Sequence, residues 1–100
     1  MQPPKIINQK EIQQKLSNPK DWQIKGDKLV ADFIFNDFTQ AFEFMTTLAP
    51  EFEKSNHHPE WTNSYKKVSI SFTTHEVGDK ITDRDVRMAN VISDIFKNFI

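Results

Sequence analysis

Apolar side chains recur at two different intervals along the chain, and the change of interval marks the predicted elements. An interval of about 3.6 residues, typical of a helix with one buried face, occurs in three segments. These predicted helices lie near residues 8–17, 38–54 and 82–99. Each begins at an N-cap residue with a partner three positions later, namely Asn8 with Glu11, Asp37 with Gln40, and Thr82 with Asp85. Pro50 lies inside the second helix, so a kink or break is expected near Ala49.

Alternation of apolar and polar residues predicts the strands. It is clearest where Val68, Ile70 and Phe72 alternate with Ser69, Ser71 and Thr73. The predicted strands cover residues 22–24, 28–35 and 63–74. The order is therefore α-β-β-α-β-α, an α+β fold in which helices cover one face of a small antiparallel sheet of about four strands. Such a short sheet keeps unpaired edges, so a homo-oligomer is expected.

Length and composition restrict the class of protein. One hundred residues have room for one core, so residues 1–100 are expected to form a single domain. The net charge is −1 with a single pair of neighbouring lysines, which argues against direct nucleic-acid binding. The chain has no cysteine, which excludes disulfides and thiolate chemistry. It shows no signal-peptide pattern and no apolar run long enough to span a membrane, so a cytoplasmic protein without membrane contact is expected.

Candidate chemistry is concentrated in the three histidines, which all fall within residues 57–75. His57 and His58 precede Pro59, which disfavours helical geometry at His58, so the pair is expected in a loop just beyond the second helix. His75 follows the clearest strand, on the side of its serines and threonines and away from the predicted core. Three imidazoles can bind zinc with an open position, or they can donate and accept protons near neutral pH. Their spacing matches no familiar ligand pattern, so proton transfer is preferred and no metal is expected.

Three further residues are candidates for supporting roles. Glu53 precedes His57 by four residues, where a carboxylate can orient an imidazole, although a solvated position beside Lys54 explains it as well. Trp61 can form an aromatic wall for a flat ligand, but a position in the core is the preferred interpretation. Asp85 has a full structural explanation as the capping-box residue of the third helix.

A family resemblance rests on an ordered set of motifs. The motifs are Glu53-(three residues)-His57-His58-Pro59-Glu60-Trp61, then Tyr65, Val68-Ser69-Ile70, Thr73-Thr74-His75-Glu76 and Thr82-(two residues)-Asp85. Together they resemble the signature of the pterin-4a-carbinolamine dehydratase family, and the resemblance extends from about Trp22 to the C-terminus. It implies an α+β fold with a four-stranded antiparallel sheet, helices on one face, and assembly into homodimers or homotetramers.

The resemblance also implies an activity. Members of this family dehydrate 4a-hydroxytetrahydrobiopterin, a pterin carbinolamine, to the quinonoid dihydropterin, which regenerates the cofactor after aromatic amino-acid hydroxylation. They use no metal or organic cofactor. Carried over by position, the catalytic residues are His57, His58 and His75. The residues that line the pterin are His57, His58, Pro59, Thr74, His75, Glu76 and Val77, and further signature positions are Glu53, Trp61 and Asp85.

The sequence departs from the family in the loop after His75. Many members carry a Gly-Gly-Leu-Thr type loop there, whereas this chain has Val77-Gly78-Asp79-Lys80-Ile81-Thr82, with one glycine and two charges. A longer or reshaped loop is therefore expected, which weakens the carry-over at Val77. Animal relatives also serve as dimerisation cofactors of a homeodomain transcription factor, so the alternative function is a protein-binding module that acts as a transcriptional cofactor.

Overall fold

The computed structural model describes residues 3–100, which form an α+β fold. Its main elements, in chain order, are α1 (Gln9–Lys15), β1 (Gln23–Lys25), β2 (Lys28–Ile34), α2 (Phe38–Ser55), β3 (Glu60–Ser64), β4 (Lys67–Phe72) and α3 (Asp83–Phe96). Short 3₁₀ turns lie at η1 (Pro19–Asp21), η2 (His75–Val77) and η3 (Lys97–Phe99). The predicted fold class is confirmed, with one strand more than the predicted order contained.

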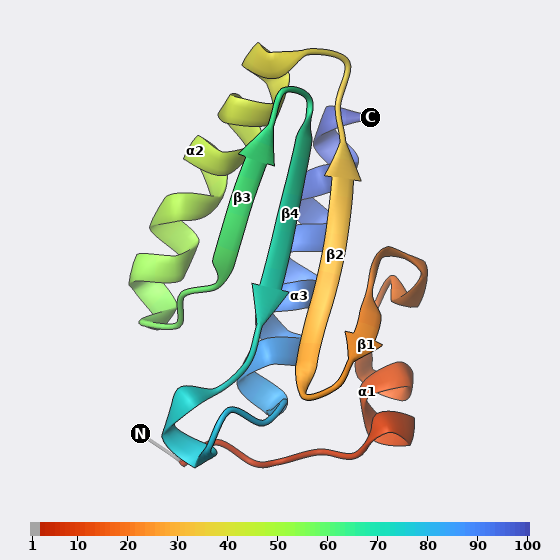
Figure 1. Cartoon of the computed structure of the whole chain (residues 1–100), viewed down its shortest axis with the longest axis vertical. Coiled ribbons are helices and arrows are strands. Elements are labelled where there is room, and N and C mark those ends of the chain that lie inside the picture. The colour runs from red at the N-terminus through yellow and green to blue at the C-terminus, as the bar shows by residue number, and fades with distance from the viewer. Residues whose placement is uncertain (1–2) are drawn as a thin grey trace.

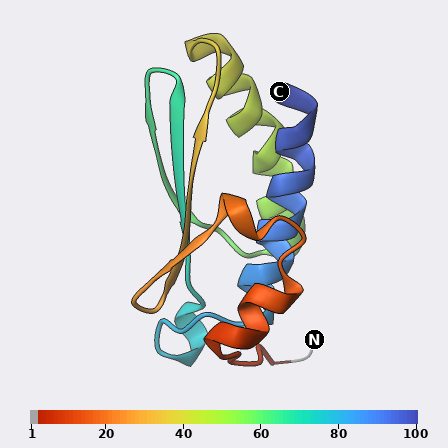
Figure 2. The same cartoon turned by 90° about the vertical axis from the view of Figure 1, so that its right-hand side faces the viewer.

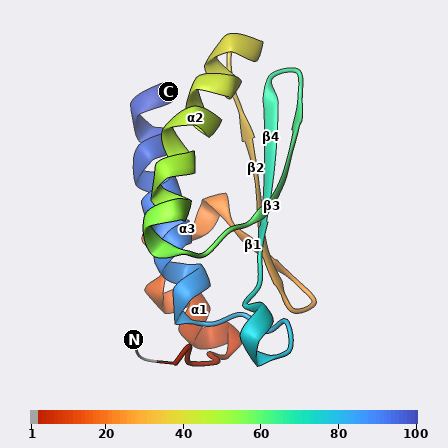
Figure 3. The same ribbon diagram turned by 90° about the vertical axis from the view of Figure 1, so that its left-hand side faces the viewer.

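The strands form one antiparallel sheet in the order β1-β2-β4-β3. Figure 1 looks onto the sheet, with α3 behind it. The two views turned by 90° show the three α-helices on one side of the sheet and, among residues 3–100, no α-helix on the other (Figures 2 and 3). Among residues 3–100, no helix is long and apolar enough to cross a membrane. The sheet therefore has one face buried under helices and one open face.

The segment 63–74, predicted as one strand, is part of a hairpin. Strand β3 begins earlier, at Glu60, and a tight turn at residues 65–66 leads into β4. Tyr65 has the left-handed φ of 53° that reverses the chain. The side-chain amide of Asn63 donates to the carbonyl oxygens of Tyr65 (3.1 Å) and Lys67 (3.0 Å), which holds the turn. The turn was missed because it contains neither glycine nor proline, the usual sequence signals of a reversal.

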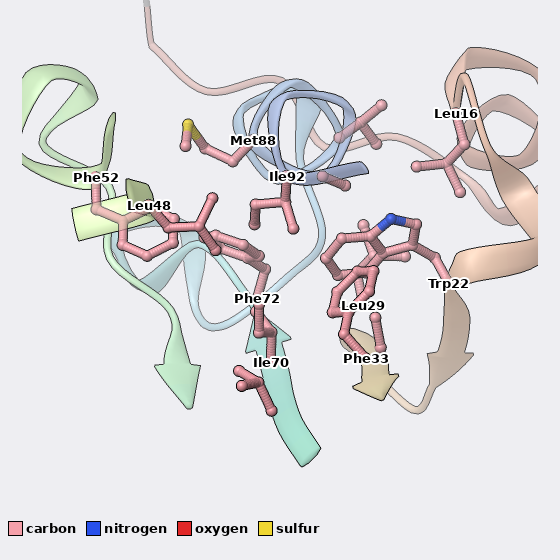
Figure 4. Packing of buried hydrophobic residues seen from close by; sticks show 14 of the residues in the cluster. Leu16, Trp22, Leu29, Phe33, Leu48, Phe52, Ile70, Phe72, Met88 and Ile92 are labelled. Atoms are coloured by element: carbon pink, nitrogen blue, oxygen red, sulfur yellow. The ribbon is translucent and has the colours of Figure 1, made fainter. Parts of the chain in front are cut away.

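The core lies between the sheet and the helices, as Figure 4 shows from close by. The inward residues of β2 and β4, which include Leu29, Phe33, Ile70 and Phe72, are almost completely buried. They pack against Leu48 and Phe52 of α2 and against Met88 and Ile92 of α3. Burial of each large apolar side chain contributes about 1.5–3 kcal/mol. Trp22 closes the end near α1, where its indole N–H donates to the buried Ser93 hydroxyl (2.9 Å), so this polar pair is satisfied within the core.

The predicted N-caps are present in all three helices. Asn8 accepts from the Glu11 amide and Asp37 from the Gln40 amide, both at 2.8 Å, and Thr82 opens α3 with a complete capping box. Of the kink or break expected near Ala49, the break is wrong, because α2 runs from Phe38 to Ser55 with Pro50 inside it. Pro50 lies on the exposed side, while Leu48 and Phe52 are buried on either side of it. Packing of these two residues holds the helix together across the proline.

This arrangement predicts that Pro50→Ala stabilises the protein. Proline is less favourable than alanine in a helix interior by about 3 kcal/mol, and the loss of its restraint on the unfolded chain offsets about 0.4–1 kcal/mol of that gain. We expect urea unfolding to show a rise in the free energy of unfolding of about 2 kcal/mol. Lys54→Ala, an exposed change in the same helix, is the control and should stay within about 0.5 kcal/mol of the parent. A destabilised Pro50→Ala variant would show that the proline is required here.

Candidate active site

The end of α2 places the first histidine. Asn56 adopts the left-handed conformation (φ 52°), its amide donates to the Glu53 carbonyl, and the His57 amide donates to the Phe52 carbonyl (3.2 Å). This pair of bonds is the Schellman pattern that ends many helices, and asparagine tolerates its left-handed residue. The helix thus ends before His58, as the sequence predicts from Pro59. His57 leaves it turned towards the protein interior.

His57 lies against the core and is held from two sides. Its side chain is 12% exposed, and its ring stacks on Phe72 with a centroid distance of 5.4 Å and an interplanar angle of 18°. Its Nε2 atom lies 2.6 Å from Oδ1 of Asp85. A flat apolar contact and a short polar bond together leave the imidazole little freedom to rotate.

Asp85 is the most constrained charged group near the histidines. Its side chain is fully buried (0% exposed), and Oδ2 accepts from the Thr82 amide (2.9 Å) and from the Thr74 hydroxyl (2.8 Å). The Thr74 and Thr82 hydroxyls are 2.6 Å apart, and Thr82 also accepts from the Arg84 amide. Burial of a carboxylate is costly unless several donors satisfy it. The capping residue predicted from sequence therefore also binds His57, through its other oxygen.

His58 occupies a more open position. Its side chain is 51% exposed, and Nε2 lies 3.5 Å from Oε2 of the exposed Glu53. Glu53 was considered as a partner for His57, but the structure places it beside His58. Ion pairs with such exposed partners contribute little to stability, about 0–1 kcal/mol. The contact therefore orients His58 only loosely.

His75 begins η2 and is almost completely exposed (95%). Its Nδ1 lies 2.8 Å from Oδ1 of Asp79, a residue of the loop that departs from the family pattern. The loop is closed by the Thr74 amide, which donates to the Lys80 carbonyl (2.9 Å), and Lys80 forms an ion pair with Asp27 (3.0 Å). His75 therefore projects from a short loop that is tied to the β1–β2 turn.

The structure brings His58 and His75 together. Both line a hollow of about 190 Å³ at one end of the sheet, where the α2–β3 link and η2 lie (Figure 1). The other lining residues of this hollow are Lys28, Glu60, Ser71, Thr73 and Asp79. His57 instead lines a neighbouring hollow of about 220 Å³, with Arg84, Arg87 and Met88 among its walls. The histidines therefore face two openings. They are still linked, because Thr74, which precedes His75, bonds the same Asp85 carboxylate as His57.

The remaining predicted residues divide between site and scaffold. Thr74 is buried, Glu76 accepts from Arg84 (2.8 Å), and Val77 is half-buried in η2. Trp61 is partly buried against the core, where it meets Phe52 edge-on at 5.2 Å, and it also lines a larger depression on the open face of the sheet. Pro59 lines the same depression.

Some lining residues were missed from the sequence. Ser71 and Thr73 share the polar side of the strand pattern that leads to His75, so the alternation contained a signal for them. Asp79 lies four residues after His75 in the same loop, whereas Lys28 comes from the start of β2, and only tertiary structure places it at the hollow. Within residues 3–100, no three His, Cys, Asp or Glu side chains are arranged to hold a metal ion.

Comparison with known proteins supplies the family. Residues 5–95 match the family model described as pterin 4 alpha carbinolamine dehydratase. Relatives provisionally named pterin-4-alpha-carbinolamine dehydratase include one from Prochlorococcus marinus strain MIT 9515, 39% identical over 94% of this chain and 97% of the relative. Another, from Opitutus terrae, is 42% identical over 86% of this chain and 89% of the relative.

Solved structures agree with this match. The crystal structure of a transcriptional coactivator/pterin dehydratase from Brucella melitensis superposes with a TM-score of 0.81 at 34% identity, over 90% of this chain and 97% of that chain. A pterin dehydratase-like protein described as a RuBisCO assembly factor in the alpha-carboxysome gives a TM-score of 0.62 at 21% identity. The match covers 75% of this chain and 86% of that chain, and it shows the shared fold alone. The chain therefore belongs to the pterin-4a-carbinolamine dehydratase family, which is named for a hydro-lyase activity.

Proposed function

We propose that this chain, acting as a single domain, dehydrates 4a-hydroxytetrahydrobiopterin to the quinonoid dihydropterin and water, in tetrahydrobiopterin recycling. The observation that carries the proposal is the hollow of about 190 Å³ at which His58 and His75 meet, with His57 held nearby in the chain by its bond to the buried Asp85. Family membership supports the substrate class. The proposed reaction uses no metal and no organic cofactor, because proton transfers suffice for it.

The reaction needs two proton transfers at neighbouring atoms. The substrate carries a hydroxyl group on C4a and a proton on the adjacent ring nitrogen, N5. An acid protonates the hydroxyl so that it leaves as water, a base removes the N5 proton, and the electron pair of that N–H bond forms the new C=N bond. Histidine suits both roles because its neutral and protonated forms are both populated near pH 7.

In the proposed division of labour, His57 and His75 form the acid–base pair, and His58 mainly holds the pterin by hydrogen bonding. The great exposure of His75 at the hollow supports its part, and the Nε2 bond to Asp85 gives His57 a defined orientation. His58 competes for the role of His57, because it shares the hollow with His75.

Alanine variants of the three histidines test this division. We expect His57→Ala and His75→Ala to lower kcat more than they raise KM, and His58→Ala to raise KM at least as much as it lowers kcat. One general acid or base contributes about 10²–10⁴-fold, and the observed losses will be smaller because the uncatalysed dehydration is not very slow. Stopped-flow decay of the carbinolamine measures both constants.

Circular dichroism of each variant is the control for folding. A drop in kcat for His58→Ala, with His57→Ala unchanged, would transfer the acid–base role to His58. Parent dehydration rates in a folded His57/His75 double variant would contradict the catalytic assignment as a whole.

Asp85 allows its capping and orienting roles to be separated. Asp85→Ala leaves buried donors at Thr74 and Thr82 without an acceptor and frees His57, so we expect a loss of about 3 kcal/mol in the free energy of unfolding and a fall in turnover. Asp85→Asn keeps a side-chain acceptor for the cap but removes the carboxylate beside His57. We expect it to lose less stability but to lose kcat, with little change in KM.

Urea unfolding and stopped-flow assays measure the two effects, and Asp83→Asn in the same helical turn is the matched control. If Asp85→Asn kept the parent kcat, Asp85 would be only a structural cap.

A second candidate function is a protein-binding module, favoured by the outer face of α2. Phe38 and Phe42 are 48% and 54% exposed, their rings lie 5.9 Å apart, and they line a hollow of about 400 Å³. Exposed aromatic patches often mark protein contacts. A partner that remains bound after all three histidines are replaced would support this function, and loss of the partner would contradict it.

The same face predicts self-association into a dimer or tetramer. We expect sedimentation at micromolar concentration to show a species larger than 11.7 kDa, and Phe42→Asp to shift it towards the monomer because the charge would be buried in the contact. Gln14→Asp, an exposed change on α1, is the control. A parent protein that sediments only as the 11.7 kDa species would contradict the prediction.

A further inference from the structure

The hollow at His58 and His75 continues into a larger depression. A trough of about 770 Å³ lies on the open face of the sheet, the face turned to the viewer in Figure 1. Glu60 and Ser71 line both the hollow and the trough, so the two spaces meet at these side chains. The volume of the trough lies within the range of about 300–1,000 Å³ that is typical of small-molecule sites. A ligand seated at the histidines therefore lies next to the trough.

Strand register orders the trough into two rows of side chains. The first row, Val30, Ser71 and Glu60, crosses three strands beside the hollow. The second row, Asp32, Ser69 and Thr62, crosses the same strands two residues further away. Two residues of a strand span about 6.6–6.8 Å. A group that contacts the second row must therefore extend well beyond the hollow.

The structure of a pterin determines which part of it enters the trough. The ring carbon C6 is bonded to N5, the nitrogen that loses its proton. A substituent on C6 therefore lies close to the histidine that acts on N5. The hollow of about 190 Å³ is much smaller than the trough of about 770 Å³, so a long substituent extends beyond the hollow. The side of the hollow that borders the trough is formed by Glu60 and Ser71, so a substituent that passes them enters the trough.

The lining of the trough selects the chemistry of the substituent. Its second row offers two hydroxyl groups and a carboxylate, groups that pair with alcohol functions. Its charged residues are the carboxylates of Asp21, Asp32 and Glu60 and the ammonium groups of Lys20 and Lys25. These mixed charges, with carboxylates in the majority, disfavour a polyanionic chain. A neutral substituent with many hydroxyl groups fits best.

We infer that the trough is a binding site for a long, neutral, polyhydroxylated C6 substituent, such as a side chain extended by a sugar unit. The inference rests on the proposed dehydratase function and makes that function more specific. Thr62 and Ser69 then determine substrate selectivity without taking part in the chemistry, because they line the trough and not the hollow.

Three carbinolamines test the inference, with a 6-methyl group, a 6-dihydroxypropyl group and a glycosylated 6-dihydroxypropyl group. In the parent protein we expect KM for the glycosylated substrate to be about tenfold lower than for the 6-methyl one, as one or two added hydrogen bonds would produce. Ser69→Trp and Thr62→Trp place a bulky side chain in the second row and so block the trough. Both positions lie on the open face of the sheet, and tryptophan is well tolerated in strands, so the fold should be kept. Each should raise KM for the glycosylated substrate about tenfold and leave the 6-methyl substrate within about twofold.

Ser64→Trp is the matched control, because Ser64 lies on β3, as Thr62 does, and is exposed outside the trough. It should leave all three substrates unchanged. Dehydration of the 6-methyl substrate with no preference for the longer ones, or an equal effect of the tryptophans on all three substrates, would overturn this inference alone. Failure to dehydrate any of the three would overturn the proposed function, and the inference with it.

Discussion

A buried carboxylate connects the parts of this site. Asp85 has no solvent exposure and is bonded to the Thr82 amide, the Thr74 hydroxyl and the His57 ring. These groups come from the start of α3, the segment after β4 and the end of α2. A charge inside a protein is tolerated only when polar groups satisfy it, so the folded state must bring all three segments together. The same requirement that closes the fold also sets the orientation of one candidate catalytic residue.

The one-sided covering of the sheet explains where ligands can bind. The helices bury one face, and each strand alternates its side chains between that face and the open one. Inward positions are therefore occupied by Leu29, Phe33, Ile70 and Phe72, and most outward positions carry hydroxyl or charged groups. The hollow and the trough lie on this outward side, so their lining can vary without a change in the core.

The histidines differ in how strongly the fold restrains them. His57 stacks on Phe72 and is bonded to a buried partner, whereas His58 and His75 are largely exposed and have exposed carboxylate partners. Exposed pairs are weak, while a partly buried bond to a fixed group restricts a ring strongly. This difference is consistent with one rigid histidine and two that can adjust to a bound ring.

The sequence by itself determined the helices, their caps, the inward faces of β2 and β4 and the position of the histidine pair beyond a helix end. These features depend on residues close together in the chain, where periodicity, N-cap chemistry and Pro59 act directly. Tertiary structure alone decided the hairpin at Tyr65, the continuity of α2 through Pro50, the bond from Asp85 to His57 and the placing of His58 with His75. Each of these depends on contacts between distant segments, or on packing that overrides a local preference, and such contacts leave no periodic trace in the sequence.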